Sequence, residues 1–289
     1  MKARIAIFCT LISISILAGV LCFPFKNPST KIYDCFLFFN ELEMLDIRFA
    51  ELYDQVDHFV LVESTETFQG NPKPLIFAEN KERFGPYLDK IIHVTINEHY
   101  ETTDPWQREY YQRNQIMRGL KDCNKHDIII VSDADEILKQ SKIKELAPNL
   151  EKNQILSCQQ KMYLFYLDRP TRYLWNGSMV TTYGQLQRTK PYALRKMRNL
   201  KKSKLKRFSI RKAQSLKDMG WHFNSLGGYE RYLKKLAAFS HTECKVPDSI
   251  EEMRKHLVDV DTCQIDESYP QYVTQNLDKL THFLDSFTR

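Results

Sequence analysis

Three carboxylates stand close together where an apolar run ends in the stretch DIIIVSDADEIL. Asp133, Asp135 and Glu136 follow the apolar residues 128–131. An Asp-x-Asp pair turns two carboxylates toward one point, where their charges repel unless a divalent cation lies between them. Mg²⁺ and Mn²⁺ prefer such oxygen ligands. The pair therefore predicts a metal site at Asp133 and Asp135, with Glu136 placed to orient the loop.

The same residues have a structural interpretation. Aspartates frequently cap helices, and a helix starting near Ser141 lies within reach. An isolated Asp-x-Asp also simply ends a strand in many proteins. On these residues alone both interpretations stay open.

The elements around the carboxylates predict an α/β fold. Apolar runs predict strands over residues 31–39, 56–64, 89–97 and 126–133. Helical spacing between them predicts helices over residues 40–53 and 106–120. The residues expected on the buried helix faces are Leu42, Leu45, Phe49 and Leu52 in the first, and Tyr110, Ile116 and Leu120 in the second.

Strands that are apolar on both faces and alternate with helices indicate a Rossmann-like, mostly parallel sheet sandwiched by helices. Ligands of such sheets bind beyond the carboxyl ends of the strands. Asp133 ends one of the four predicted strands, so it lies at that edge. The overall size supports this, because 289 residues with 43% hydrophobic side chains can bury one large core.

The N-terminal segment predicts a membrane anchor. An uncharged run of about twenty residues, long enough to span a bilayer, follows Lys2 and Arg4. We expect an uncleaved transmembrane helix in residues 1–25, a short linker in 26–31 and one domain in 32–289. The basic flank places the N-terminus in the cytoplasm and the domain outside it. A cleaved signal peptide is the alternative.

Several stretches together resemble glycosyltransferase family 17. They are YDCFLFFNELEMLDIRFAEL, VDHFVLVES with the following TFQGNPKPLIFAENKERF, WQREYYQRNQIMRGL, DIIIVSDADEI, and GWHFNSLGG with KLAAFSHTE. The resemblance runs from about Tyr33 to about Glu243. It implies a GT-A fold and inverting transfer of a sugar, N-acetylglucosamine, from a UDP-sugar donor to a glycan hydroxyl. It also implies Mn²⁺ or Mg²⁺ as cofactor.

The resemblance assigns roles to particular residues. Asp133 and Asp135 match the family-wide D-x-D, in which the second aspartate binds the metal and the first reaches the metal or the ribose. A histidine from the C-terminal half often completes such a site; we expect His222, with His241 in reserve, although a histidine satisfied in the core is the simpler interpretation. Glu243 is the expected proton acceptor because it belongs to the stretch KLAAFSHTE that carries the resemblance. The alternative is that Glu243 is a solvated surface carboxylate.

Three further residues are expected to face the donor nucleotide. Glu63 ends the second predicted strand, and Arg113 and Asn114 lie on the helix before the fourth. The alternatives are a solvated strand end for Glu63 and an i, i+4 ion pair with Glu109 for Arg113. The Gly/Pro loop after Glu63 is expected to cover the donor.

The remaining patterns narrow the partners. Residues 195–217 are basic without an acidic residue, but aromatic side chains are scarce there, so we expect a solvated surface that faces a membrane or phosphate groups, and no nucleic acid. The acceptor is expected to be a glycoprotein, glycolipid or polysaccharide. The catalytic domain is expected on the lumenal or extracytoplasmic side of a membrane, which in a eukaryote would be Golgi-like.

The cysteines are widely spaced and form no C-x-x-C pair, so they predict neither a zinc site nor a disulfide scaffold. Two other functions stay open: a nucleotide-sugar-binding or carbohydrate-binding protein without turnover, and a metal-dependent phosphohydrolase, which would need a further metal cluster.

Overall fold

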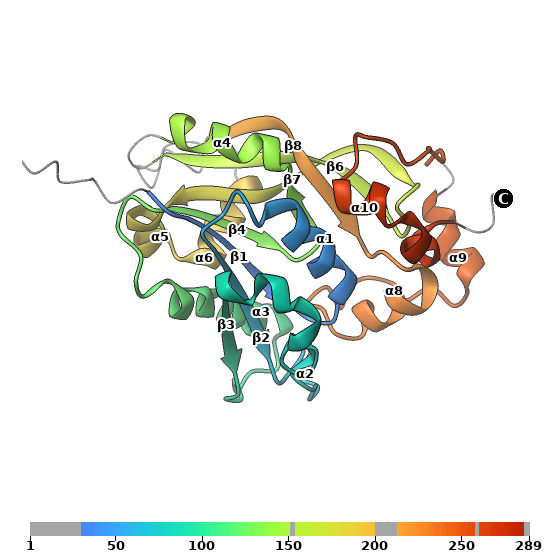
Figure 1. Cartoon of the computed structure of the whole chain (residues 1–289). Coiled ribbons are helices and arrows are strands. Elements are labelled where there is room, and N and C mark those ends of the chain that lie inside the picture. The colour runs from blue at the N-terminus through green and yellow to red at the C-terminus, as the bar shows by residue number, and fades with distance from the viewer. Residues whose placement is uncertain (1–29, 151–153, 200–212, 258–259, 286–289) are drawn as a thin grey trace, which may run out of the picture.

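The computed structural model describes residues 30–150, 154–199, 213–257 and 260–285. An eight-stranded sheet in the order β3-β2-β1-β4-β7-β6-β8-β5 runs through them (Figure 1). The strands are β1 (Ile32–Phe38), β2 (His58–Ser64), β3 (Ile91–Ile96), β4 (Ile128–Asp133), β5 (Glu136–Leu138), β6 (Ile155–Leu164), β7 (Pro170–Thr182) and β8 (Gln214–Asn224).

Helices connect and cover these strands. In the N-terminal half they are α1 (Leu42–Leu52), α2 (Ile76–Glu79), α3 (Pro105–Asn114) and α4 (Gln140–Asn149), with 3₁₀ segments η1 (Lys81–Lys90) and η2 (Gln115–Leu120). In the C-terminal half they are α5 (Tyr183–Thr189), α6 (Pro191–Lys196), α8 (Gly228–Leu236), α9 (Ile250–Arg254) and α10 (Gln271–Gln275), with η3 (Met197–Asn199), η4 (Lys255–Leu257) and η5 (Leu277–Phe283).

The four predicted strands are β1 to β4, and they pair in parallel as expected. The C-terminal half departs from the prediction, because β4–β7, β7–β6 and β5–β8 are antiparallel and only β6–β8 is parallel. The fold is therefore α/β with a mixed sheet rather than a mostly parallel one. The predicted helix near Ser141 is present as α4.

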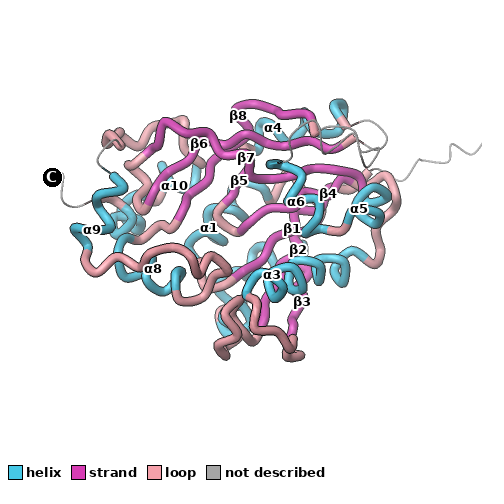
Figure 2. Tube along the Cα trace, turned by 180° about the vertical axis from the view of Figure 1, so that it is seen from behind, coloured by secondary structure: helices cyan, strands magenta, loops and turns pink. Residues whose placement is uncertain are grey.

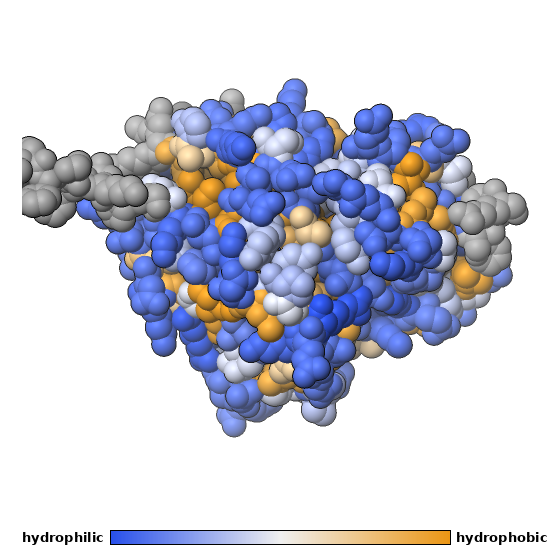
Figure 3. Space-filling view, in the orientation of Figure 1, coloured by the Kyte–Doolittle hydropathy of each residue, from blue (hydrophilic) through white to orange (hydrophobic). Residues whose placement is uncertain are grey.

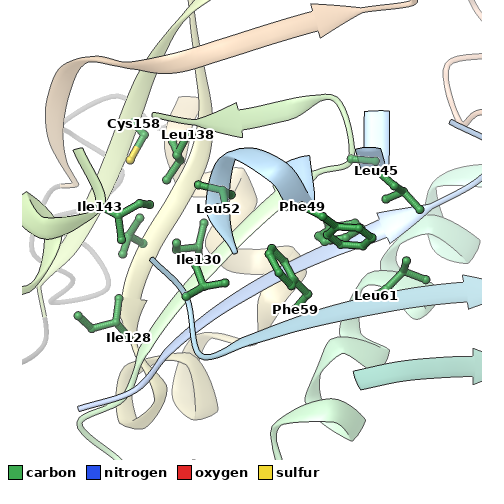
Figure 4. Close-up of a cluster of buried hydrophobic side chains, with 14 of the residues drawn as sticks. Leu45, Phe49, Leu52, Phe59, Leu61, Ile128, Ile130, Leu138, Ile143 and Cys158 are labelled. Atoms are coloured by element: carbon green, nitrogen blue, oxygen red, sulfur yellow. The ribbon is translucent and has the colours of Figure 1, made fainter. Parts of the chain in front are cut away.

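Helices cover both faces of the parallel half. Leu45, Phe49 and Leu52 of α1 pack on one face against Phe59 of β2 and Ile130 of β4 (Figure 4). On the other face, Ile116 and Leu120 of η2 belong to a second buried cluster with Val60 of β2, Leu186 of α5 and Leu194 of α6. Figure 2 shows α5 and α6 beside β4. Tyr110, predicted to be buried with them, is 45% exposed instead.

The surface of the protein is mainly hydrophilic on one face. On the face seen in Figure 3, hydrophilic side chains predominate and the apolar ones form separate small groups. Within the described ranges, no helix has both the length and the apolar character that crossing a bilayer requires. The predicted anchor, residues 1–25, lies outside those ranges.

All five cysteines in the described ranges are free thiols, and Cys35 and Cys158 are buried.

Candidate functional site

The carboxylates lie where the strand order of the sheet reverses. β1 leads through α1 to β2 on one side, while β4 lies on the other side of β1. The chain segments that leave the carboxyl ends of β1 and β4 therefore run apart, and the crevice between such segments is the usual ligand site of these sheets. Asp133 ends β4, and Asp135 follows in the turn to β5. The prediction that the Asp-x-Asp pair lies at this edge is confirmed.

A buried arginine of α1 holds the turn that carries the pair. Arg48 forms a bidentate ion pair with Asp34 of β1, at 2.6 and 2.7 Å. Its guanidinium also donates to the backbone carbonyls of Asp133 (3.0 Å), Ala134 (3.3 Å) and Glu136 (2.9 Å). A planar guanidinium with five donors suits this task because it spans several acceptors at once.

Asp133 is clamped between two arginines. One carboxylate oxygen is 2.8 Å from Arg113 of α3, and the other is 2.6 Å from Arg195 of α6. Although burial opposes ionisation, these guanidinium groups hold the pKa of Asp133 well below its usual range. Arg113 also pairs with Glu109 at 2.9 Å, so its predicted surface ion pair exists, but within a buried network.

Glu136 fixes both the loop and one of these arginines. Its fully buried carboxylate accepts from the backbone N–H of Asp133 at 3.0 Å, as the expected loop-orienting role requires. It also pairs with Arg195 at 2.7 Å and accepts from the indole of Trp175 at 2.6 Å. Asp133 is thus positioned from both its backbone and its side chain.

Asp135 has a different environment, since no arginine pairs with it among the described residues. Its carboxylate is 2.9 Å from the ammonium of Lys235 on α8 and 3.6 Å from Nε2 of His222 on β8. Burial again opposes the charge, yet Lys235 and His222 hold the pKa of Asp135 below its usual range. The pairing of β5 with β8 sets Glu136 opposite His222 and so brings this histidine to the site.

The donor set fits a divalent ion in part. Nδ1 of His222 is buried and has no hydrogen-bond partner among the described residues, which marks an incompletely satisfied imidazole. Asp135 and His222 together offer one oxygen and one nitrogen. Mg²⁺-type sites commonly use one or two carboxylates and take their other ligands from substrate phosphates and water.

Asp133 does not join this donor set. Both of its oxygens pair with arginines, so its predicted role as a metal ligand has no support from this geometry. In the described part of the chain, no three His, Cys, Asp or Glu side chains converge as a metal cage. A metal here would be held by Asp135, His222 and the substrate together.

A pocket of about 250 Å³ opens beside Asp135. The loop after β1 supplies Glu41 to its wall, the first turn of α1 supplies Glu43, and α8 supplies Arg231 and Lys235. One oxygen of Glu41 accepts from the backbone N–H groups of Phe39 (3.1 Å) and Asn40 (3.0 Å), which orients the carboxylate. Glu43 is engaged by Arg231 at 2.8 and 3.0 Å.

Two residues expected to bind the donor have structural roles instead. Glu63 is fully buried, and its oxygens accept from the backbone N–H of Phe77 (2.9 Å) and contact His93 (3.0 Å). The side-chain oxygen of Asn114 accepts from the backbone N–H of Tyr192 at 3.1 Å, in the first turn of α6. Neither group is directed at the crevice, so the donor-binding expectation is not supported for Glu63 or Asn114.

The residues from the loop after α8 also lie elsewhere. Glu243 is 64% exposed and pairs with His241 at 2.6 Å, and it does not line the pocket beside Asp135. This arrangement matches the surface alternative, and the predicted role of Glu243 as proton acceptor gains no support. His241 packs its ring against Trp106 of α3, with centroids 4.4 Å apart, and leaves the Asp135 site to His222.

Aromatic side chains flank the arginine side of the site. Trp106 and Tyr110, one helical turn apart on α3, are 36% and 45% exposed. Tyr110 packs against Tyr192 of α6 with ring centroids 4.8 Å apart. α3 and α6 also carry Arg113 and Arg195. Exposed aromatic faces beside a polar site suit the apolar faces of sugar rings or a nucleobase.

Sequence reasoning missed Arg195, Lys235 and Glu41. Arg195 lies in the basic stretch that was predicted to be solvated, and the structure corrects this, because Arg195 is buried and Arg198 packs over Trp175 at 4.6 Å. Residues 200–212 of the stretch lie outside the described ranges. The sequence offered one signal for Lys235, which is its position near the end of an amphipathic helix shortly before the SHTE stretch. Its partner Asp135 lies a hundred residues away in the sequence, so the ion pair could not be predicted.

Comparison with known proteins decides the family. The model of glycosyltransferase family 17 matches residues 13–266. The chain belongs to glycosyltransferase family 17. Within this family, it is 35% identical over 107 residues to the beta-1,4-mannosyl-glycoprotein 4-beta-N-acetylglucosaminyltransferases of Homo sapiens and Rattus norvegicus. These matches cover 34% of this chain and 20% of each relative, so the chain spans about a fifth of the length of the curated relatives it matches.

A solved structure gives a more distant likeness to this family 17 chain. It is the mannosyltransferase PcManGT from Pyrobaculum calidifontis in complex with GDP-Man and Mn²⁺. The TM-score is 0.43 at 12% identity, over 79% of this chain and 70% of the other. No residue or ligand is transferred from it.

Proposed function

We propose that this family 17 chain is an inverting, metal-dependent glycosyltransferase with a GT-A fold. Its donor would be UDP-N-acetylglucosamine and its acceptor a hydroxyl of an N-glycan or another glycan, by analogy with the relatives' names. The observation that carries this proposal is the site at the switch point of the sheet. There Asp135 lines a pocket and contacts His222, beside Asp133 held by two arginines.

Each part of the transfer has a candidate group. Bound to Asp135 and His222, Mn²⁺ or Mg²⁺ would neutralise the charge on the leaving UDP. Asp133, fixed by Arg113 and Arg195 and about a third exposed, is placed to accept a hydrogen bond from the ribose. Because its position is fixed before the donor arrives, this contact needs no reorganisation during the reaction.

We place the proton acceptor at Glu41 instead of Glu243. Glu41 lines the pocket that Asp135 lines, and its backbone hydrogen bonds orient the carboxylate. A general base must come within hydrogen-bond reach of the acceptor hydroxyl, and a group on the pocket wall meets this condition more readily than an exposed one. Trp106 and Tyr110 would hold the flat faces of sugar or base beside the arginines.

The test is UDP release from UDP-N-acetylglucosamine in the presence of glycan acceptors, with Mn²⁺ and with a chelator. We expect Mn²⁺-dependent turnover that Asp135→Asn lowers by about 10²–10³-fold, the loss typical of one electrostatic group in the transition state. Glu145→Gln, which alters an exposed ion pair on α4, is the control and should retain turnover. Donor binding without release from any UDP-sugar would favour a binding protein.

We further propose that residues 1–25 anchor the protein in a membrane and that residues 32–289 form one catalytic domain on the lumenal or extracytoplasmic side. The support is the uncharged run behind Lys2 and Arg4. Alkaline extraction of membranes and protease protection test this. Release into the alkaline supernatant, or digestion of the domain from the cytoplasmic side, would contradict it.

A further inference from the structure

Lys235 is the most exposed of the described cations that pair with Asp133, Asp135 or Glu136. Its ammonium contacts Asp135 at 2.9 Å, while 27% of its side chain stays exposed on the pocket wall. Arg113 and Arg195 are 5% and 6% exposed, and each bridges two carboxylates. A lysine is a point charge on a flexible four-carbon stem, whereas an arginine fork bound to two partners is fixed.

The ammonium of Lys235 is paired with the Asp135 carboxylate, which a divalent ion would need as a ligand. Asp135 has one oxygen 2.9 Å from Lys235 and the other 3.6 Å from His222. A doubly charged ion bound to Asp135 and His222 would lie a few ångströms from a positive ammonium, in surroundings where like charges repel strongly. Lys235 and the ion therefore compete for the same carboxylate.

We propose that Lys235 is an internal counter-cation of the metal site, which neutralises Asp135 in the empty site and moves to the donor's diphosphate when metal and donor bind. This inference rests on the proposed function and deepens it. Lys235 needs no large movement, because it already lines the pocket next to Asp135. The charge of the empty site stays balanced, so a buried carboxylate is never left unpaired.

The exchange couples metal binding to nucleotide binding. Without a diphosphate, the ion must displace Lys235 and leave it without its partner, so metal binds weakly. With a diphosphate present, the displaced ammonium gains phosphate oxygens. Each ligand then raises the affinity for the other by the same factor, as linkage requires.

The experiment measures Mn²⁺ affinity of the full-length chain from the EPR signal of free Mn²⁺, with and without UDP. Lys235→Met removes the charge and keeps much of the stem, and Lys235→Gln is a second, polar replacement in case the first is unstable. Lys144→Met is the control, because this lysine of α4 is exposed and does not line the pocket beside Asp135. Asp135→Asn identifies the part of the Mn²⁺ binding that depends on this carboxylate.

We expect both Lys235 variants to bind Mn²⁺ at least about fivefold more tightly than the wild type without UDP, the lower end of typical coupling factors. The gain in affinity on adding UDP should shrink in them, and Lys144→Met should match the wild type. Equal affinities and equal UDP effects in all lysine variants would overturn the inference but leave the proposed function intact. If no protein shows Mn²⁺ binding that depends on Asp135, even with UDP, the metal dependence fails and the inference with it.

Discussion

Strands β1 to β4 pair with one another only in parallel and are connected through helices, whereas β5 to β8 pair with one another in both directions. The two halves also bring different groups to the site. The parallel half and the turn after it supply the carboxylates Asp133, Asp135 and Glu41. The mixed half supplies Arg195, His222 and Lys235. Arg113 of the parallel half and Glu136 of β5 complete this network, so the charges of the site are compensated only when both halves of the sheet have formed.

The largest expected effect concerns the base of the parallel half. Arg48→Ala should lower the free energy of unfolding by about 3–5 kcal/mol, because it leaves Asp34 buried without its partner. Urea unfolding followed by circular dichroism measures this. Arg83→Ala is the matched control, since Arg83 pairs with Asp46 at 41% exposure, and exposed pairs contribute about 1 kcal/mol or less. Equal losses in the two variants would show that Arg48 does not hold the carboxylate turn.

The parallel half was predictable from the sequence because its signals are local. Apolar runs specify β1 to β4, and the spacing of Leu45, Phe49 and Leu52 specifies α1. The position of Asp133 and Asp135 then follows from the rule that ligands bind at strand carboxyl ends. The same rule led to the unsupported expectation that Glu63 faces the donor. A residue at the carboxyl end of a strand can turn its side chain outward or into the core, and the sequence does not show which.

The mixed half could not be predicted in the same way, because its pairings join distant segments. β5 meets β8 about eighty residues later, and only that pairing brings His222 to Asp135. The composition of residues 195–217 indicated a solvated surface, yet Arg195 is buried because two carboxylates from other segments compensate its charge. Such compensation is a property of the tertiary structure.

The next effect separates the two candidate proton acceptors, one from each half. Glu41→Gln should lower kcat on the order of 10²-fold, the lower end for loss of a general base, with little change in UDP affinity. Glu243→Gln should keep the wild-type rate, because its carboxylate is exposed and lies outside the pocket. Initial rates of UDP release and UDP titrations supply both quantities. A large loss in Glu243→Gln with normal turnover in Glu41→Gln would restore the assignment made from the sequence.

A smaller effect tests the arginine that the mixed half contributes. Arg195→Lys keeps the charge but cannot reach Asp133 and Glu136 together. Loss of one hydrogen bond to a charged group is worth about 1.5 kcal/mol, so kcat/KM should fall about tenfold. Arg188→Lys is the control and should have no effect, because the Arg188 side chain of α5 is exposed. An unchanged kcat/KM in Arg195→Lys would mean that charge alone, without the bridge, positions Asp133.

The smallest effect is a pH dependence of stability that arises where the halves meet. The pKa of Asp135 is lower in the folded protein than in the unfolded chain, where it is about 3.9. Its ion pair with Lys235 therefore stabilises the fold fully at neutral pH. This contribution decreases as the pH falls below the unfolded value, and it is lost once the pH passes the folded one.

Asp135→Asn isolates this contribution. The wild type should be more stable than the variant at pH 7, and the difference in free energy of unfolding should narrow steadily from pH 5 to pH 3. Urea unfolding at intervals across this range measures it, with Glu145→Gln as the exposed control whose difference from the wild type stays small. A difference between wild type and Asp135→Asn that does not change with pH would show that Asp135 titrates alike in both states. The mixed half would then contribute no net charge stabilisation to this carboxylate.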